Sequence, residues 1–175
     1  LKLAYEKRAM WNEMRMSPTD LADLSAATLT FLMNGMTPAG NWTGIFAPGE
    51  RVRLRFINAA GNTFYDVRIP GLQLTVVQTD GIDVHPVTVD ELRFGPGETY
   101  DVIVTPRDDV YTIFAQTMDR SGYARGTLST QPGLEAPVPE PDAVQWLSMT
   151  DMMGVMGSAS HEGHPETHTM THHHP

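Results

Sequence analysis

Arg51-Val52-Arg53-Leu54-Arg55-Phe56-Ile57-Asn58 is the stretch that decides the fold, because its charged and apolar side chains alternate. This period of two is typical of a β-strand with one buried and one solvated face. The alternation returns in residues 64–69, and Pro70-Gly71 then predicts a turn before a third apolar run that begins at Leu72. Asp80-Gly81 predicts the next turn, so residues 51–81 are expected to form three consecutive strands.

The rest of the central region has the same character. Further strands are predicted at residues 28–33, 87–92, 99–105, 111–116 and 124–128. Asn34-Gly35 predicts a turn, and residues 37–48, rich in Gly, Pro and Asn, predict a loop. About eight short strands at this spacing are typical of a sandwich or a Greek-key barrel, so we expect an all-β fold.

Three segments are expected along the chain. Residues 1–24 form an N-terminal helical or linker segment, with a short helix that starts at Ser17-Pro18 and ends near Leu24. Residues 25–134 hold the strands and the core. Residues 135–175 begin as a Pro-rich connector and continue as a flexible tail rich in Met and His.

Composition excludes several functions. The formal net charge of −9 argues against nucleic acid as a partner, because phosphate binding needs a basic surface. The absence of cysteine excludes disulfides, a thiol nucleophile and a blue-copper centre with a thiolate ligand. No apolar run approaches the roughly 20 residues of a membrane helix. The chain starts at Leu1, so we expect either a removed leader or a longer parent protein.

The strand region contains no convincing catalytic set. Its one histidine, His85, is expected in a loop before Pro86 and is interpreted as structural, because no second His or Cys lies near it in sequence. The acids of this region fall in turns and at strand ends, where solvated carboxylates are common: Asp80, Asp83, Asp90 and Glu91.

The tail is chemically unusual, and we call residues 149–174 the Met/His segment. Thioethers suit Cu(I), whereas imidazoles suit Cu(II), Ni(II) or Zn(II), so copper is the metal that uses both. The predicted copper ligands are Met149, Met152, Met153, Met156, His161, His164, His168, Met170, His172, His173 and His174. The alternative is that the first four methionines belong to a helix packed on the domain and that the last three histidines remain from an expression tag.

Several motifs resemble one family: Phe31-Leu-Met-Asn-Gly35, Thr37-Pro-Ala-Gly-Asn-Trp-Thr-Gly44, Phe64-Tyr-Asp-Val-Arg-Ile-Pro-Gly71, His85-Pro-Val-Thr-Val-Asp-Glu91 and Glu98-Thr-Tyr-Asp-Val-Ile-Val104. Together with residues 48–58 and 114–128, they resemble the middle cupredoxin domain of bacterial copper-resistance multicopper oxidases of the CopA/PcoA type. The resemblance covers residues 15–153. It implies a cupredoxin-like Greek-key β-sandwich and an exported, periplasmic parent protein with a role in copper tolerance.

In that family the middle domain carries no copper ligands, and the first and last domains supply them. The resemblance therefore implies a non-catalytic domain, inactive by itself, whose partners are copper ions and the other cupredoxin domains of the parent oxidase. Two further interpretations remain open at this point. The chain could be a free-standing periplasmic protein that sequesters or delivers copper, or a β-sandwich interaction module whose tail has no metal function.

Overall fold

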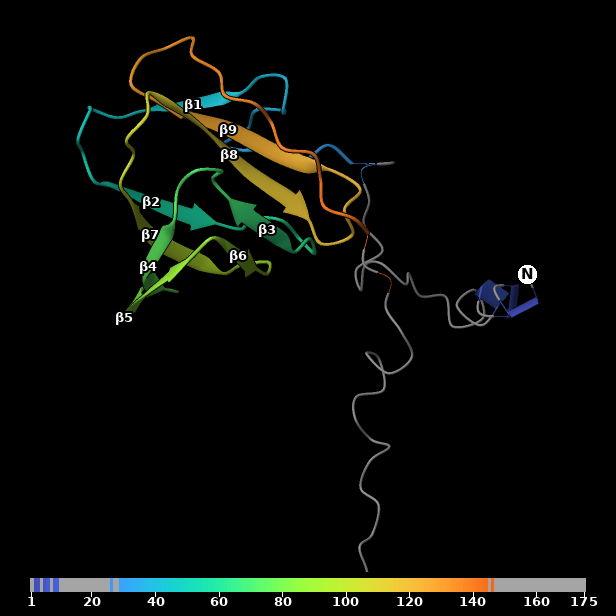
Figure 1. The fold of residues 1–175 in the computed structure, drawn as a ribbon. Helices are drawn as coiled ribbons and strands as arrows, with labels where there is room; N and C mark the ends of the chain where they lie inside the picture. Colours follow the sequence, from blue (N-terminus) through green and yellow to red (C-terminus); the bar gives the residue numbers. More distant parts are fainter. Residues whose placement is uncertain are drawn as a thin grey trace, which may run out of the picture.

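The computed structural model describes residues 2, 3, 5, 6, 8, 9, 26, 29–144 and 146. Within these residues nine strands form two sheets (Figure 1). The first sheet has the order β1-β9-β8-β3-β6 and the second has the order β2-β7-β4-β5. The strands are β1 (Trp42–Ile45), β2 (Val52–Ile57), β3 (Tyr65–Arg68), β4 (Leu74–Thr79), β5 (Ile82–Val89), β6 (Glu91–Phe94), β7 (Thr99–Val104), β8 (Val110–Thr117) and β9 (Tyr123–Ser129).

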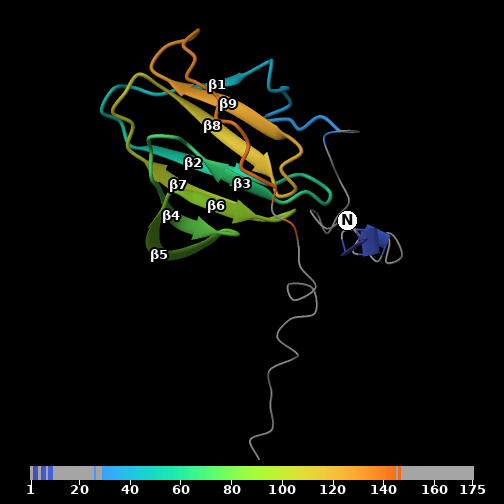
Figure 2. The ribbon, with the colours of Figure 1, turned by 45° about the vertical axis from the view of Figure 1, so that its right-hand side comes forward.

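The two sheets lie face to face, with the core between them (Figure 2). Apolar residues from alternate positions of both sheets fill this core, as expected for packed sheets. Among the most buried are Val67, Ile69, Leu74, Val102, Val104, Ile113 and Leu128. The predicted all-β sandwich is therefore confirmed.

The central stretch folds largely as its pattern predicts. In β2, Val52, Leu54 and Phe56 pack against the core, and Arg53 and Arg55 point away from it. The two predicted turns also form. Gly71 has a φ of 86° between the bridged residues Ile69 and Leu72. Asp80 and Gly81, with φ angles of 46° and 80°, join β4 to β5 in the conformation that two-residue hairpin turns require.

The predicted strand at residues 28–33 is wrong. Residues 29–32 have no regular structure, and Met33 makes only an isolated bridge to Met36 across the Asn34-Gly35 turn. The apolar character of this stretch has another cause, since the Phe31 ring is buried edge-on against Tyr65 at 5.8 Å. Phe31 fills part of the core although no neighbouring strand among the described residues pairs with its backbone, whereas Leu29 and Leu32 are exposed.

The predicted loop at residues 37–48 is also wrong in part, because it contains β1. This strand pairs parallel to β9, with Trp42 opposite Gly126. A four-residue strand without alternating polarity has no local signature. These residues form a strand because they pair with β9, which lies far along the chain.

The predicted strand at residues 87–92 is two strands in different sheets. β5 ends at Val89 and pairs with β4, whereas β6 starts at Glu91 and pairs with β3. The chain therefore changes sheet at Asp90. His85 lies within β5 rather than in a loop. Pro86 is tolerated beside it because β5 is the edge strand of its sheet, where one row of backbone groups needs no partner.

The N-terminal segment is helical where the structure describes it. Residues 2, 3, 5, 6, 8 and 9 are helical, and the short helix predicted at residues 17–24 lies outside the described residues. In the part of the chain that the structure describes, no helix is long and apolar enough to cross a membrane.

Candidate functional site

All eleven predicted copper ligands of the Met/His segment lie outside the described residues. Across the described residues, no group of three or more His, Cys, Asp or Glu side chains is placed to hold a metal ion. His85 is exposed on the edge strand β5. A blue-copper centre needs a thiolate and two imidazoles, so the donors of the described sandwich do not fit one.

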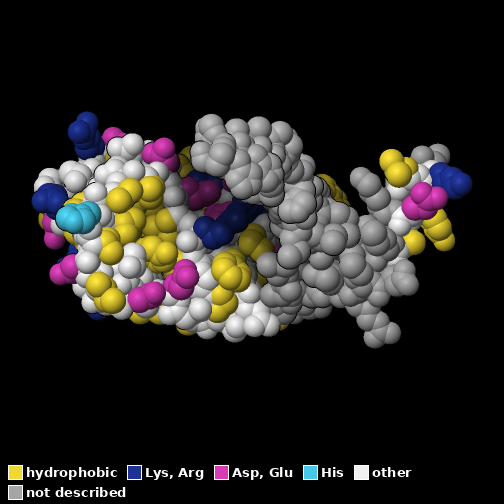
Figure 3. All heavy atoms as spheres, turned by 90° about the horizontal axis from the view of Figure 1, so that it is seen from below, with side chains coloured by type: hydrophobic (Ala, Val, Ile, Leu, Met, Phe, Trp, Pro, Cys, Tyr) yellow, Lys and Arg dark blue, Asp and Glu magenta, His cyan; other side chains and the backbone are white. Residues whose placement is uncertain are grey.

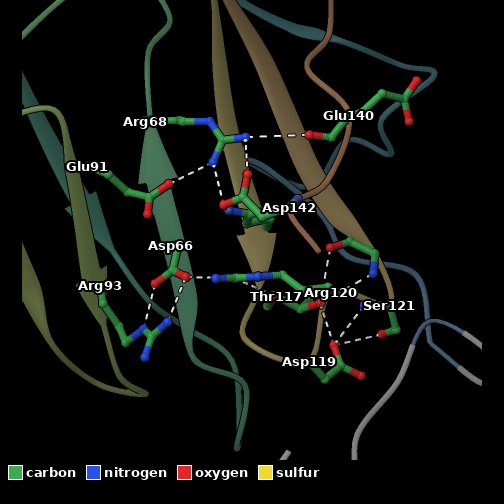
Figure 4. A network of polar contacts seen from close by, with 12 residues as sticks. Asp66, Arg68, Glu91, Arg93, Thr117, Asp119, Arg120, Ser121, Glu140 and Asp142 are labelled. Atoms are coloured by element: carbon green, nitrogen blue, oxygen red, sulfur yellow. Dashed lines mark hydrogen bonds and ion pairs between the residues drawn. The ribbon is translucent and has the colours of Figure 1, made fainter. Parts of the chain in front are cut away.

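The most developed polar feature is a charge network on the outer face of the first sheet (Figure 4). We define it by six side chains that carry three positive and three negative charges: Asp66, Arg68, Glu91, Arg93, Arg120 and Asp142. Strands β3 and β6 each contribute two of them, the β8–β9 turn contributes one, and Asp142 comes from the segment after β9.

Asp66 is the buried centre of one half of this network, with 3 % of its side chain exposed. Arg93 forms a two-fold contact with its carboxylate, at 2.6 Å and 2.8 Å. The Nη1 of Arg120 lies 2.6 Å from Asp66 Oδ2, and only 4 % of the Arg120 side chain is exposed. Burial by itself would raise the pKa of Asp66, but the hydrogen bonds from Arg93 and Arg120 outweigh it and lower the pKa.

The position of Arg120 depends on the tight turn between β8 and β9. Its φ is 63°, and its Nη1 also donates to the Thr117 carbonyl at 3.0 Å. Asp119 supports the same turn by accepting hydrogen bonds from the Ser121 backbone amide and hydroxyl. The turn therefore holds a buried guanidinium beside the Asp66 carboxylate.

Arg68 is the centre of the other half. Its Nη1 donates to Glu91 Oε2 at 2.8 Å and to Asp142 Oδ2 at 3.0 Å, and its Nη2 donates to Asp142 Oδ1 at 3.1 Å. The guanidinium also lies 5.0 Å from the centre of the Phe114 ring, within the range of a cation–π contact. Burial lowers the pKa of Arg68, but its hydrogen bonds to Glu91 and Asp142 raise it overall, so the group remains charged.

Residues 135–142, which we call the strap, lie against this sheet. Thr112 Oγ1 donates to the Ala136 carbonyl at 3.1 Å, and Asn41 Nδ2 donates to Glu135 Oε1 at 3.3 Å. At the other end, Gln116 and Asp142 exchange two hydrogen bonds of 2.6 Å and 2.9 Å. The first part of the predicted connector is therefore bound to the sandwich.

A second buried carboxylate lies on the outer face of the second sheet. Asp101 in β7 accepts from Arg53 Nε at 2.7 Å and Arg55 Nε at 2.8 Å, both on the neighbouring strand β2. The arginines are half exposed or more, whereas 3 % of the Asp101 side chain is exposed. The arginine face of β2 is solvated as predicted, and it also neutralises a carboxylate that the alternation did not reveal.

Comparisons with known proteins agree with this architecture. The Cu-oxidase family, described as multicopper oxidase, matches residues 5–133. Copper resistance protein A from Escherichia coli is 62% identical over 151 residues, which are 86% of this chain and 25% of that protein. A copper resistance protein A homolog from Pseudomonas syringae pv. tomato is 57% identical over 162 residues, 91% of this chain and 28% of that protein.

A solved structure is similar as well. A variant of the laccase from B. aclada superposes with a TM-score of 0.52 and 28% identity, and the match covers 73% of this chain and 25% of that one. A two-sheet sandwich with this family match defines a cupredoxin-like domain of the oxidase class. This chain belongs to the multicopper oxidase family, and it spans about a quarter of the length of the curated relatives that it matches.

Proposed function

We propose that this chain is the non-catalytic middle cupredoxin domain of a periplasmic copper-resistance multicopper oxidase, and that its Met/His segment gathers copper. The observation that carries the proposal is the 62% identity to a copper resistance protein over 86% of this chain and 25% of that protein. The oxidase activity then belongs to the longer protein, and this domain supports the domains that perform it.

The donor chemistry of the chain supports a non-catalytic role. The whole sequence contains no cysteine, so it cannot supply the thiolate of a blue-copper site. His85 is the one histidine outside the last fifteen residues, and it is exposed on an edge strand. Copper sites of that kind would therefore have to take their ligands from other domains.

The surface supports packing against other domains of the parent. Large apolar side chains are exposed on several strands and turns, among them Ile45, Ile57, Phe64, Ile82 and Val87. Apolar side chains gather on the face seen in Figure 3. Exposed apolar patches of this kind mark interaction surfaces, and neighbouring cupredoxin domains are the partners that the length of the relatives favours.

The Met/His segment supports a copper-gathering role through its ligand types. Five thioethers suit Cu(I), and six imidazoles suit Cu(II). The two modes differ in their response to pH, because an imidazole must lose its proton to bind a metal and a thioether has none to lose.

The test is a competition titration of the full chain with a chromophoric chelator at about pH 7.5 and pH 5.5, on either side of the histidine pKa of about 6.5. Cu(II) affinity should fall steeply at the lower pH, and Cu(I) affinity should stay nearly constant. Replacing the six histidines of the segment with Ala should abolish Cu(II) binding and spare most Cu(I) binding. His85→Ala is the matched control and should change neither. Cu(II) binding that survives in the six-histidine variant would refute the assignment.

A further inference from the structure

The strap is held more strongly at its end than along its length. Asp142 makes four hydrogen bonds of 2.6–3.1 Å with Arg68 and Gln116. Its carboxylate accepts three of them, and its backbone amide donates the fourth to Gln116. Earlier in the strap, Ala136, Glu135 and Glu140 accept one hydrogen bond each, at 3.1 Å, 3.3 Å and 3.5 Å. Charge-assisted, two-fold contacts of an arginine with a carboxylate are among the strongest hydrogen bonds in proteins.

The partners of Asp142 lie on paired strands of the first sheet: Gln116 is fully buried, and 21% of the Arg68 side chain is exposed. Arg68 also donates to Glu91 and lies over the Phe114 ring, two contacts that do not involve Asp142. Gln116 and Phe114 are fully buried on β8, which pairs with β3 and β9 on either side. Strand pairing therefore fixes the backbone of both partners, and Asp142 is the group of the strap that their side chains hold.

From this geometry we infer that Asp142 is a positioning residue, which sets the point from which the Met/His segment leaves the sandwich. The inference rests on the proposed copper-binding function of that segment. It assigns to the network of Arg68, Gln116 and Asp142 the role of keeping bound copper close to the β3–β8 region of the first sheet.

The number of residues between the anchor and Met149 limits how far the first thioether can lie from the sandwich. Met149 is the seventh residue after Asp142, and an extended chain spans at most about 3.6 Å per residue, so the first thioether stays within about 25 Å of the anchor. If Asp142 is released, the nearest remaining contact is the weak one from Arg68 Nη2 to the Glu140 carbonyl, at 3.5 Å. Met149 is nine residues from Glu140 and could reach about 32 Å.

The volume open to Met149 grows with the cube of this reach, by about two-fold. The effective concentration of the first ligand near any fixed site on the neighbouring surface would fall by a similar factor. The intrinsic affinity of the segment for copper would not change, because Asp142 is not a ligand. Anchoring therefore governs where the copper is held and not how tightly.

The test measures distances between two nitroxide labels by pulsed electron paramagnetic resonance in the full chain. The sequence has no cysteine, so two introduced thiols are the only ones. Ile82→Cys lies on the β4–β5 hairpin with 70% of its surface exposed, and Ala143→Cys is exposed directly after the anchor. We expect one narrow distribution in this background, and a broad one that extends to longer distances after Asp142→Ala.

Glu140→Gln is the matched control. It removes a carboxylate from the same strap, and the contact of Glu140 with Arg68 is made by its backbone carbonyl, at 3.5 Å. The distribution should stay narrow in this variant. A narrow distribution in Asp142→Ala, a broad one in the starting background, or equal broadening in Glu140→Gln would each overturn the inference. Circular dichroism confirms that each variant is folded, and Asp142→Asn provides a milder replacement for the same measurement.

Copper binding separates this inference from the proposed function. Titration of Asp142→Ala should give the same Cu(I) and Cu(II) affinities as the unaltered chain, and the distance from bound Cu(II) to a single label at position 82 should broaden. If neither protein binds copper, the proposed function of the segment fails, and the label distances still decide whether Asp142 is the anchor. If the Asp142→Ala variant bound copper ten-fold or more weakly than the unaltered chain, the positioning role would be overturned. Asp142 would then be part of the copper site.

Discussion

Asp66 shows how unequal the two partners of one buried carboxylate can be. Arg120 is almost fully buried beside it, whereas Arg93 is about half exposed. Asp66→Ala would leave the Arg120 guanidinium buried without a counter-charge, so we expect the free energy of unfolding to fall by about 3–5 kcal/mol. Arg93→Gln leaves the Asp66–Arg120 pair in place and should cost about 1 kcal/mol or less. Urea unfolding of both variants checks this, and equal losses would contradict it.

The pH dependence of stability follows from the same residues. The pKa values of Asp66 and Asp101 are both lowered in the folded protein: for Asp66 the arginine hydrogen bonds outweigh burial, and for Asp101 the hydrogen bond from Arg55 is the main cause. A lowered folded pKa gives stability that is present above the unfolded value of about 3.9 and is lost as the pH falls through the folded value. Urea unfolding should therefore give similar stability at pH 7 and pH 5 and a clear loss at pH 3. Greater stability at pH 3 than at pH 5 would contradict this.

Strand β1 depends on a close approach that only glycine permits on β9. A Cβ atom at Gly126 would lie 3.0 Å from the Trp42 carbonyl oxygen and 2.7 Å from the Met33 sulfur. Backbone cannot move aside without disturbing the parallel pairing, so Gly126→Ala should destabilise the protein by roughly 1–3 kcal/mol. At Gly61 a Cβ would meet nothing within 4 Å, and Gly61→Ala should change stability by less than about 1 kcal/mol. Thermal unfolding compares the two; similar effects at both positions would show that the β1–β9 contact is not the cause.

The strap is the second element whose contribution can be measured by itself. A chain that ends at Leu134 keeps all nine strands and should fold cooperatively. It loses the hydrogen bonds that Thr112, Gln116 and Arg68 make to the strap, each worth about 1 kcal/mol, so we expect it to be less stable by roughly 2–4 kcal/mol. A chain that ends at Trp146 keeps the strap and should match the full chain in urea unfolding. If both truncations cost the same, the strap is not what stabilises the sheet.

At the scale of the whole molecule, the chain belongs to the multicopper oxidase family and contains no cysteine. When it is loaded with Cu(II), we expect no intense blue absorption and no phenol oxidation above that of free copper, because the chain has no thiolate to form the charge-transfer site. A visible spectrum and an oxidation assay measure both. An intense blue colour or turnover above the copper control would contradict the non-catalytic role.

Local features of the chain were sufficient for much of this fold. A period of two in polarity is set by neighbouring residues alone, so β2 and its solvated arginines were predicted correctly. The turns at Asn34-Gly35 and Asp80-Gly81 were also predictable, because a positive φ is tolerated best by Gly, Asn and Asp. The absence of thiolate chemistry followed directly from the cysteine count.

Tertiary structure decided the features that depend on residues distant in sequence. β1 exists because β9 offers hydrogen-bond partners, and the apolar run at residues 87–92 divides at Asp90 because the two halves pair with different sheets. Arg68 and Asp142 are 74 residues apart, and nothing in either local sequence indicates that they meet. The sequence by itself determined which residues form a strand face or a turn. Only the folded chain decided which strands pair and which charges neutralise one another, because these contacts form between segments that the local pattern cannot relate.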